Sequence, residues 1–143
     1  MNSDAEEFEP RNDLERRLLA MHQERLAPEQ FMHALLDSQV FMPVKDQLGI
    51  DGFQASQRAV PLSLEDEDGV KILILFTSPE RGKTFLQDFP GFGGGILEDL
   101  KWVLQKMGAG YGIAINPGWE VGIDLDPDTV TQLARQAAAQ AGD

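Results

Sequence analysis

The spacing of hydrophobic residues changes several times along the chain, and each change marks an expected element. From Asn12 onward, apolar residues recur three or four positions apart, as on one face of a helix. Pro28 is suited to the first turn of a second helix. The same spacing predicts further helices after Ser78, from Leu97 to Met107 and after Asp126.

Several shorter segments show the alternating or fully apolar pattern of β-strands. They are Gln39–Val44, Val60–Leu64, Val70–Phe76, Tyr111–Ile115 and Trp119–Leu125. Pro43 lacks a backbone N–H, which predicts an edge position for the first strand. The polar run Glu65–Gly69 predicts one hairpin, and Asn116-Pro117-Gly118 predicts a second with a type II turn. The helical segments between the hairpins can return the chain beside a parallel strand. We therefore expect an α+β fold with a mixed, largely antiparallel sheet of about five strands covered by helices.

The length of 143 residues fits one domain. Residues 1–10 are acidic and polar and end at Pro10, which predicts a disordered leader before a single domain over residues 11–143. This leader lacks the basic start and apolar stretch of a signal peptide, and no apolar run approaches the roughly 20 residues of a membrane span. We therefore expect a cytoplasmic protein without membrane contact. The absence of cysteine excludes disulfides and thiol catalysis.

The chain carries 24 acidic and 12 basic residues, a net charge of −12. Such a charge repels nucleic acid and anionic lipid and speeds association with a basic protein. Simple solubility is the alternative explanation. The candidate partner-binding residues are Glu65, Asp66, Glu67, Asp68 and Phe92. The first four lie in the expected hairpin turn. Phe92 lies in the glycine run 91–95, which is either a flexible connection or a mobile loop that presents the aromatic ring.

Residues 77–84 end in Gly-Lys-Thr after an apolar strand and therefore resemble a phosphate-binding P-loop. Thr77 stands where that loop requires glycine, and Pro79 lacks an amide, so we expect Gly-Lys-Thr inside a helix instead. His22 and His33 have no carboxylate or further ligand at a matching spacing. We therefore expect no catalytic residues, no metal and no cofactor, and a protein that is not an enzyme.

Three segments in series resemble the N-terminal domain of the SseB family. They are Phe31–Val44, Leu73–Arg81 with its Thr-Ser-Pro-Glu-Arg, and Ile115–Gly118 followed by Leu125–Pro127. The resemblance covers roughly residues 28–140. It implies a bacterial protein whose family is named for enhanced serine sensitivity, without catalytic residues that can be transferred, and longer members have a second, C-terminal domain. The helix from Asn12 is extra to the resembling part and is a candidate contact for a homo-oligomer.

Two functional hypotheses follow. The first is a non-enzymatic interaction module that binds a basic protein partner, for example as an immunity or adaptor protein. The alternative is a small-molecule sensor or regulator linked to amino-acid metabolism, with a ligand pocket at Asn116, Gly118 and Trp119. A well-formed apolar pocket with converging polar groups would favour the alternative.

Overall fold

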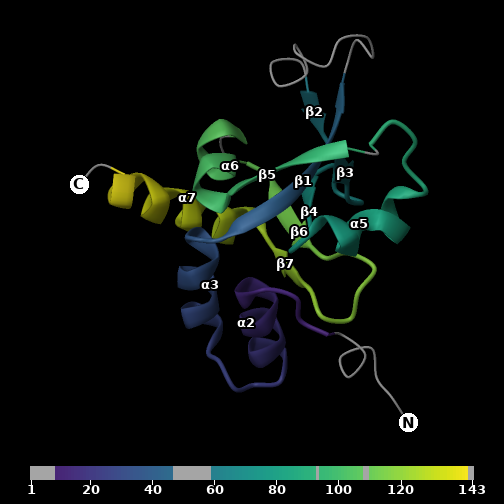
Figure 1. The fold of residues 1–143 in the computed structure, drawn as a ribbon. Coiled ribbons are helices and arrows are strands. Elements are labelled where there is room, and N and C mark those ends of the chain that lie inside the picture. Colours follow the sequence, from purple (N-terminus) through teal and green to yellow (C-terminus); the bar gives the residue numbers. More distant parts are fainter. Residues whose placement is uncertain (1–8, 47–58, 93, 108–109, 142–143) are drawn as a thin grey trace.

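The helices lie close to the positions predicted from hydrophobic spacing (Figure 1). The computed structural model describes residues 9–46, 59–92, 94–107 and 110–141. Within these ranges the helices are α2 (Asp13–His22), α3 (Pro28–Leu36), α5 (Pro79–Leu86), α6 (Leu100–Met107) and α7 (Pro127–Ala141). Most of the predicted acidic leader therefore lies outside the described residues.

The strands form two sheets rather than one. They are β1 (Gln39–Asp46), β2 (Ala59–Pro61), β3 (Ser63–Glu65), β4 (Lys71–Leu75), β5 (Gly94–Asp99), β6 (Gly112–Ile115) and β7 (Ile123–Leu125). One sheet has the order β2-β1-β5 and the other β3-β4-β6-β7. Only β4 and β6 pair in parallel among these strands, and the chain between them contains α5 and α6. The predicted α+β class and largely antiparallel pairing are confirmed, whereas the single five-stranded sheet was wrong.

The two sheets meet at Leu62, in the middle of a segment that the sequence predicted as one strand. The backbone N–H of Leu62 donates to the carbonyl of Pro43 at 3.0 Å, and its own carbonyl accepts from the N–H of Ile74 at 3.0 Å. Leu62 therefore bonds to β1 in one sheet and to β4 in the other. A pair of backbone hydrogen bonds between Phe41 and Phe76 joins the sheets a second time.

The position of β1 corrects the edge-strand prediction made from Pro43. β1 is the central strand of its sheet, with β2 on one side and β5 on the other. In an antiparallel pair, the N–H and carbonyl of one residue point to the same neighbour. The carbonyl of Pro43 points to Leu62, so the missing N–H faces that residue too. Because the Leu62 carbonyl bonds to Ile74, no acceptor is left without a donor.

The glycine run also differs from its prediction, because its last two described residues are part of β5 and not of a flexible connection. Gly95 lies opposite Pro43 in the pairing of β5 with β1. A Cβ at Gly95 would come within 2.5 Å of Cζ of Phe41 and 2.6 Å of the carbonyl oxygen of Met42. Glycine thus permits a close approach of the two strands. Leu97 is also in β5, and the helix predicted from it begins at Leu100.

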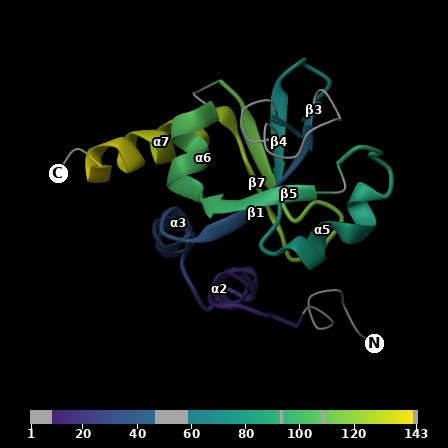
Figure 2. The same ribbon diagram turned by 45° about the horizontal axis from the view of Figure 1, so that its top comes forward.

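The strands separate two hydrophobic clusters. The main core lies between the sheets and α2, α3, α6 and α7, and Figure 2 shows α3, α6 and α7 on the side away from α5. Its buried residues include Leu18, Phe31, Leu73, Ile113 and Val130. The second core contains Ile74, Phe76 and Ala114 and is covered by aromatic and aliphatic residues of α5 and the following segment. We call the side of β4 and β6 that faces this second core the outer face.

Candidate functional site

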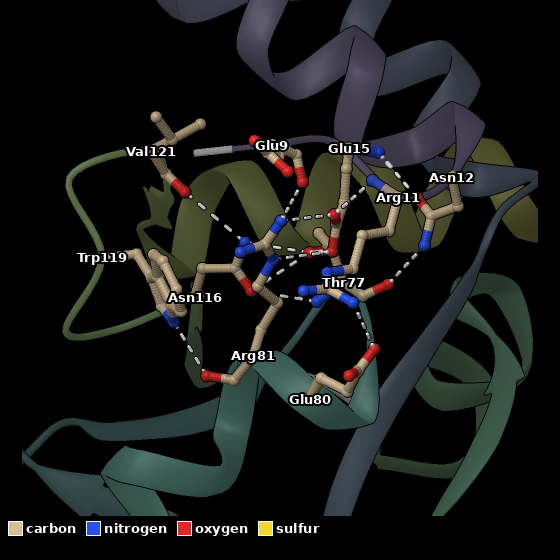
Figure 3. Close-up of polar contacts among 10 residues, drawn as sticks. All are labelled: Glu9, Arg11, Asn12, Glu15, Thr77, Glu80, Arg81, Asn116, Trp119 and Val121. Atoms are coloured by element: carbon tan, nitrogen blue, oxygen red, sulfur yellow. Dashed lines mark hydrogen bonds and ion pairs between the residues drawn. The ribbon is translucent and has the colours of Figure 1, made fainter. Parts of the chain in front are cut away.

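Four polar side chains from distant parts of the chain meet in the interior (Figure 3). Glu15 lies on α2, Thr77 follows β4, Arg81 lies on α5 and Asn116 follows β6. Their exposed fractions are 0%, 3%, 5% and 1% in that order. Buried polar groups are tolerated when they bond to one another, and we call these four residues the buried network.

The buried network is centred on a two-point ion pair. Nε of Arg81 donates to Oε2 of Glu15 at 3.1 Å, and Nη2 donates to Oε1 at 2.9 Å. The carboxylate also accepts from Oγ1 of Thr77 at 2.7 Å and from the backbone N–H of Arg11 at 2.9 Å. Burial alone raises the pKa of Glu15, but these hydrogen bonds and the charge of Arg81 outweigh it and hold that pKa below its ordinary value. A carboxylate with a lowered pKa is a weak base, which suits a structural role.

Asn116 attaches the β6–β7 turn to the network. Its Oδ1 accepts from the backbone N–H of Thr77 at 3.0 Å, and its Nδ2 donates to Oγ1 of Thr77 at 2.9 Å. Asn116 has a φ of 59°, in the left-handed region that asparagine tolerates better than most residues. The N–H of Trp119 bonds to the Asn116 carbonyl at 3.1 Å, and Gly118 has a φ of 89°, so the predicted type II turn is confirmed.

The predicted pocket residues Asn116, Gly118 and Trp119 do lie together, and they line a pocket of about 420 Å³. The indole N–H of Trp119 donates to the carbonyl of Arg81 at 2.8 Å, and the guanidinium carbon of Arg81 lies 4.6 Å from the ring centroid. The amide of Asn116 bonds to Thr77. The polar atoms of both side chains therefore bond to the protein interior.

Sequence reasoning did not identify Glu15 or Arg81 as partners. The two residues are 66 positions apart, and no local spacing relates them. A signal was nevertheless present, because Thr77 and Arg81 both lie in the second segment that resembles the SseB family, and Asn116 lies in the third. The resembling segments are thus the ones that build much of the buried network.

The acidic hairpin turn lies on the surface between β3 and β4, and all of Glu65–Asp68 is exposed. Antiparallel pairing of the two strands confirms the predicted hairpin. Oδ1 of Asp66 accepts from the backbone N–H groups of Asp68 and Val70, each at 2.9 Å. Asp66 therefore shapes the turn. We call the four residues Glu65–Asp68 the acidic turn.

A groove of about 390 Å³ lies beside the acidic turn, over the outer face of β4 and β6 and next to the first residues of α7. Its apolar lining includes Val70, Ile72 and Ala114. Its acidic lining consists of Asp66, Asp124 and Asp126. Sequence analysis identified Asp66 as a candidate contact but did not associate the two later aspartates with it, because they become neighbours only through the pairing of β4, β6 and β7.

Phe92 is placed differently from the acidic turn. It is partly buried and packs against the second core, and Nζ of Lys45 lies 5.7 Å from its ring centroid. It is not among the residues that line the groove. The structure thus does not bring Phe92 and the groove into one site.

The structure also bears on the Gly-Lys-Thr run, on metal binding and on membrane spans. Lys83 and Thr84 lie within α5, so the Gly-Lys-Thr run is helical as predicted. In the described ranges, no three side chains of His, Cys, Asp or Glu are arranged to hold a metal ion. No helix in these ranges combines the length and apolar character needed to cross a membrane.

The structure defines an α+β domain in which two sheets are joined at Leu62, and the buried network connects the ends of β4 and β6 to α2 and α5. The chain belongs to the SseB protein N-terminal domain family, whose model matches residues 14–132. The matched range contains nearly all of α2. No curated protein and no solved structure matches the chain.

Proposed function

We propose that this domain is a non-enzymatic interaction module of the bacterial cytoplasm that binds a basic protein partner. The observation that carries the proposal is the acidic turn, whose four carboxylate residues are all exposed beside a groove lined by two further aspartates. An immunity or adaptor protein that masks a basic toxin or secretion component is one specific form of this function.

The buried network supports a binding role over a catalytic one. Glu15 and Arg81 would be the natural candidates for acid–base chemistry, but they bond to each other at two points in the interior. Thr77 and Asn116 are likewise engaged with each other. These contacts give the four side chains of the buried network a structural role.

The net charge of −12 supports a basic partner. An acidic surface attracts a basic protein over a distance of about one Debye length, roughly 8 Å at physiological salt. Binding should therefore weaken as salt rises, chiefly through slower association.

The test is capture of partners from the bacterial lysate by the tagged protein and by the variant Glu67→Lys/Asp68→Lys. This variant spares Asp66, which shapes the turn, and Glu65, which lies opposite Lys71. The matched control is Glu24→Lys/Glu29→Lys, which makes the same change of charge at two exposed residues, one just after α2 and one in the first turn of α3. In Figures 1 and 2 these helices lie away from β3.

We expect one stoichiometric basic partner that the parent protein and the control retain at low salt. High salt should release it, and the turn variant should not retain it. Retention that survives both high salt and charge reversal at the turn would contradict the proposal.

The alternative function, a small-molecule sensor or regulator linked to amino-acid metabolism, draws its support from the pocket at the β6–β7 turn. Its weakness is that the polar atoms of Asn116 and Trp119 are bonded toward the interior. A saturable thermal shift with an amino acid, abolished by Glu120→Trp at the pocket, would favour this alternative. A homo-oligomer through α2 stays a prediction, and it would require the polar side of α2, because Leu14 and Leu18 are in the main core.

A further inference from the structure

The groove beside the acidic turn occupies a part of the outer sheet face that α5 leaves open. Phe85 and Leu86 of α5 pack over the second core, which contains Ile74 and Phe76 near the end of β4. Ile72, near the start of β4, packs against the edge of this core and also lines the groove. Figure 2 shows α5 near one end of β4 and the β3–β4 hairpin at the other. The groove thus has a hydrophobic floor that the domain itself covers only in part.

Three aspartates give this groove a negative rim. Asp124 lies opposite Ala114 in the pairing of β6 with β7, so both residues are on the outer face. Asp66 and Asp126 use their Oδ1 atoms to accept backbone N–H groups. The N–H of Thr129 lowers the pKa of Asp126, which keeps that carboxylate ionised. Among the residues that the structure describes, no lysine, arginine or histidine lines the groove.

The spacing of the carboxylates favours an extended cation over a metal ion. Among the described residues, no three acidic or histidine side chains converge in the way that a metal site requires. The aspartates instead come from the acidic turn, from β7 and from the residue before α7. Lysine and arginine suit such a groove, because their apolar stems cover hydrophobic surface while the charged ends reach carboxylates.

We propose that the groove binds an extended segment of the basic partner, with a lysine or arginine stem on Val70 and Ile72 and its charged end among the three aspartates. This inference rests on the proposed function and adds to it the place of contact and the chemistry of the bound segment. The volume of about 390 Å³ accommodates at least one such side chain together with part of its backbone.

The probe is an end-capped hexapeptide of alternating lysine and serine, titrated into the full chain and followed by the amide resonances. The groove variant is Asp124→Asn, which removes a charge with little change in shape. It leaves Asp66 and Asp126, whose side chains accept backbone N–H groups, unchanged. The matched control is Glu120→Gln, because Glu120 is exposed and does not line the groove. A second peptide replaces lysine by 2,4-diaminobutyrate, which keeps the charge and shortens the apolar stem.

We expect saturable shifts at Ile72, Gly112 and Ala114, and binding weakened about two- to fivefold by Asp124→Asn but unchanged by Glu120→Gln. The shortened peptide should bind more weakly than the lysine peptide. Shifts confined to Glu65–Asp68, with the same peptide affinity in Asp124→Asn as in the parent protein, would contradict binding in the groove but not the proposed function. Equal affinity for the two peptides would overturn the role of the hydrophobic floor. If neither the parent protein nor the control binds the lysine peptide, the groove and the proposed preference for a basic partner both fail.

Discussion

At the scale of single residues, the ion pair between Glu15 and Arg81 is the buried contact whose loss should affect the stability of the fold. Both side chains lie almost wholly out of contact with solvent, at 0% and 5% exposure. A buried ion pair gains little net energy over an apolar pair, but removal of one member leaves an uncompensated charge. The pair also joins α2 to α5, two helices far apart in the sequence.

We therefore expect Glu15→Gln to lower the free energy of unfolding by about 3 kcal/mol, because the buried guanidinium of Arg81 would lose the carboxylate that it contacts at two points. The matched control is Asp13→Asn, which neutralises the partner of Arg16 on the exposed side of the same helix. Screening by solvent makes that loss much smaller. Urea denaturation followed by circular dichroism measures both variants.

The dependence on pH gives this prediction an independent readout. The pKa of Glu15 is lowered in the folded protein, so its contribution to stability is complete above the unfolded pKa of about 4.3. That contribution is lost as the pH falls through the lower, folded pKa. The difference in unfolding free energy between the parent protein and Glu15→Gln should be constant near neutral pH and shrink below pH of about 4. A difference that stays constant into the acid range would show that the loss came from packing.

At the scale of elements, β5 shows how glycine can promote strand pairing. Gly94 and Gly95 are neighbours in the same strand but have different surroundings. A Cβ at Gly94 would meet nothing within 4 Å, whereas one at Gly95 would overlap the ring of Phe41 and the backbone of Met42. The side chain and the opposite backbone would both have to move to accommodate it.

We expect Gly95→Ala to lower the free energy of unfolding by roughly 1 to 3 kcal/mol through this overlap. Gly94→Ala should change it by much less, because the added methyl group has space. Chemical denaturation compares the two variants, and equal losses would mean that backbone freedom, rather than the approach of β1, decides the cost.

How far the sequence predicts the elements depends on whether their signal is local. The periodic apolar residues of α3 and α7 and the Asn116-Pro117-Gly118 turn contain their own signals, and all three were predicted. β5 was missed because a glycine run normally interrupts structure, and the need for glycine becomes visible only when β1 lies beside it, with Phe41 and Met42 in close contact. The acidic turn was found from its composition. The groove and the Glu15–Arg81 pair required the strand order and the packing of helices, which no local pattern contains.

At the scale of the whole molecule, the net charge of −12 should affect folding and binding in opposite directions. Like charges repel one another more strongly in the compact state than in the extended chain, so salt that screens them stabilises the fold. The same screening weakens attraction to a basic partner. Between about 10 mM and about 100 mM salt, the Debye length falls from roughly 30 Å to roughly 10 Å.

Over that range we expect the thermal midpoint to rise by roughly 2 to 5 °C, which corresponds to about 1 kcal/mol, while affinity for the lysine peptide falls. Differential scanning calorimetry and the peptide titration measure the two effects on one preparation. Glu67→Lys/Asp68→Lys should show a smaller rise of the midpoint, because it makes the net charge less negative. A midpoint that falls with salt in the parent protein would mean that specific attractions, such as those of Arg11 with Glu80 and Lys101 with Asp37, outweigh the general repulsion. In that case the acidic excess would not destabilise the fold, and the salt dependence of binding would have to be explained by the charges of the groove alone.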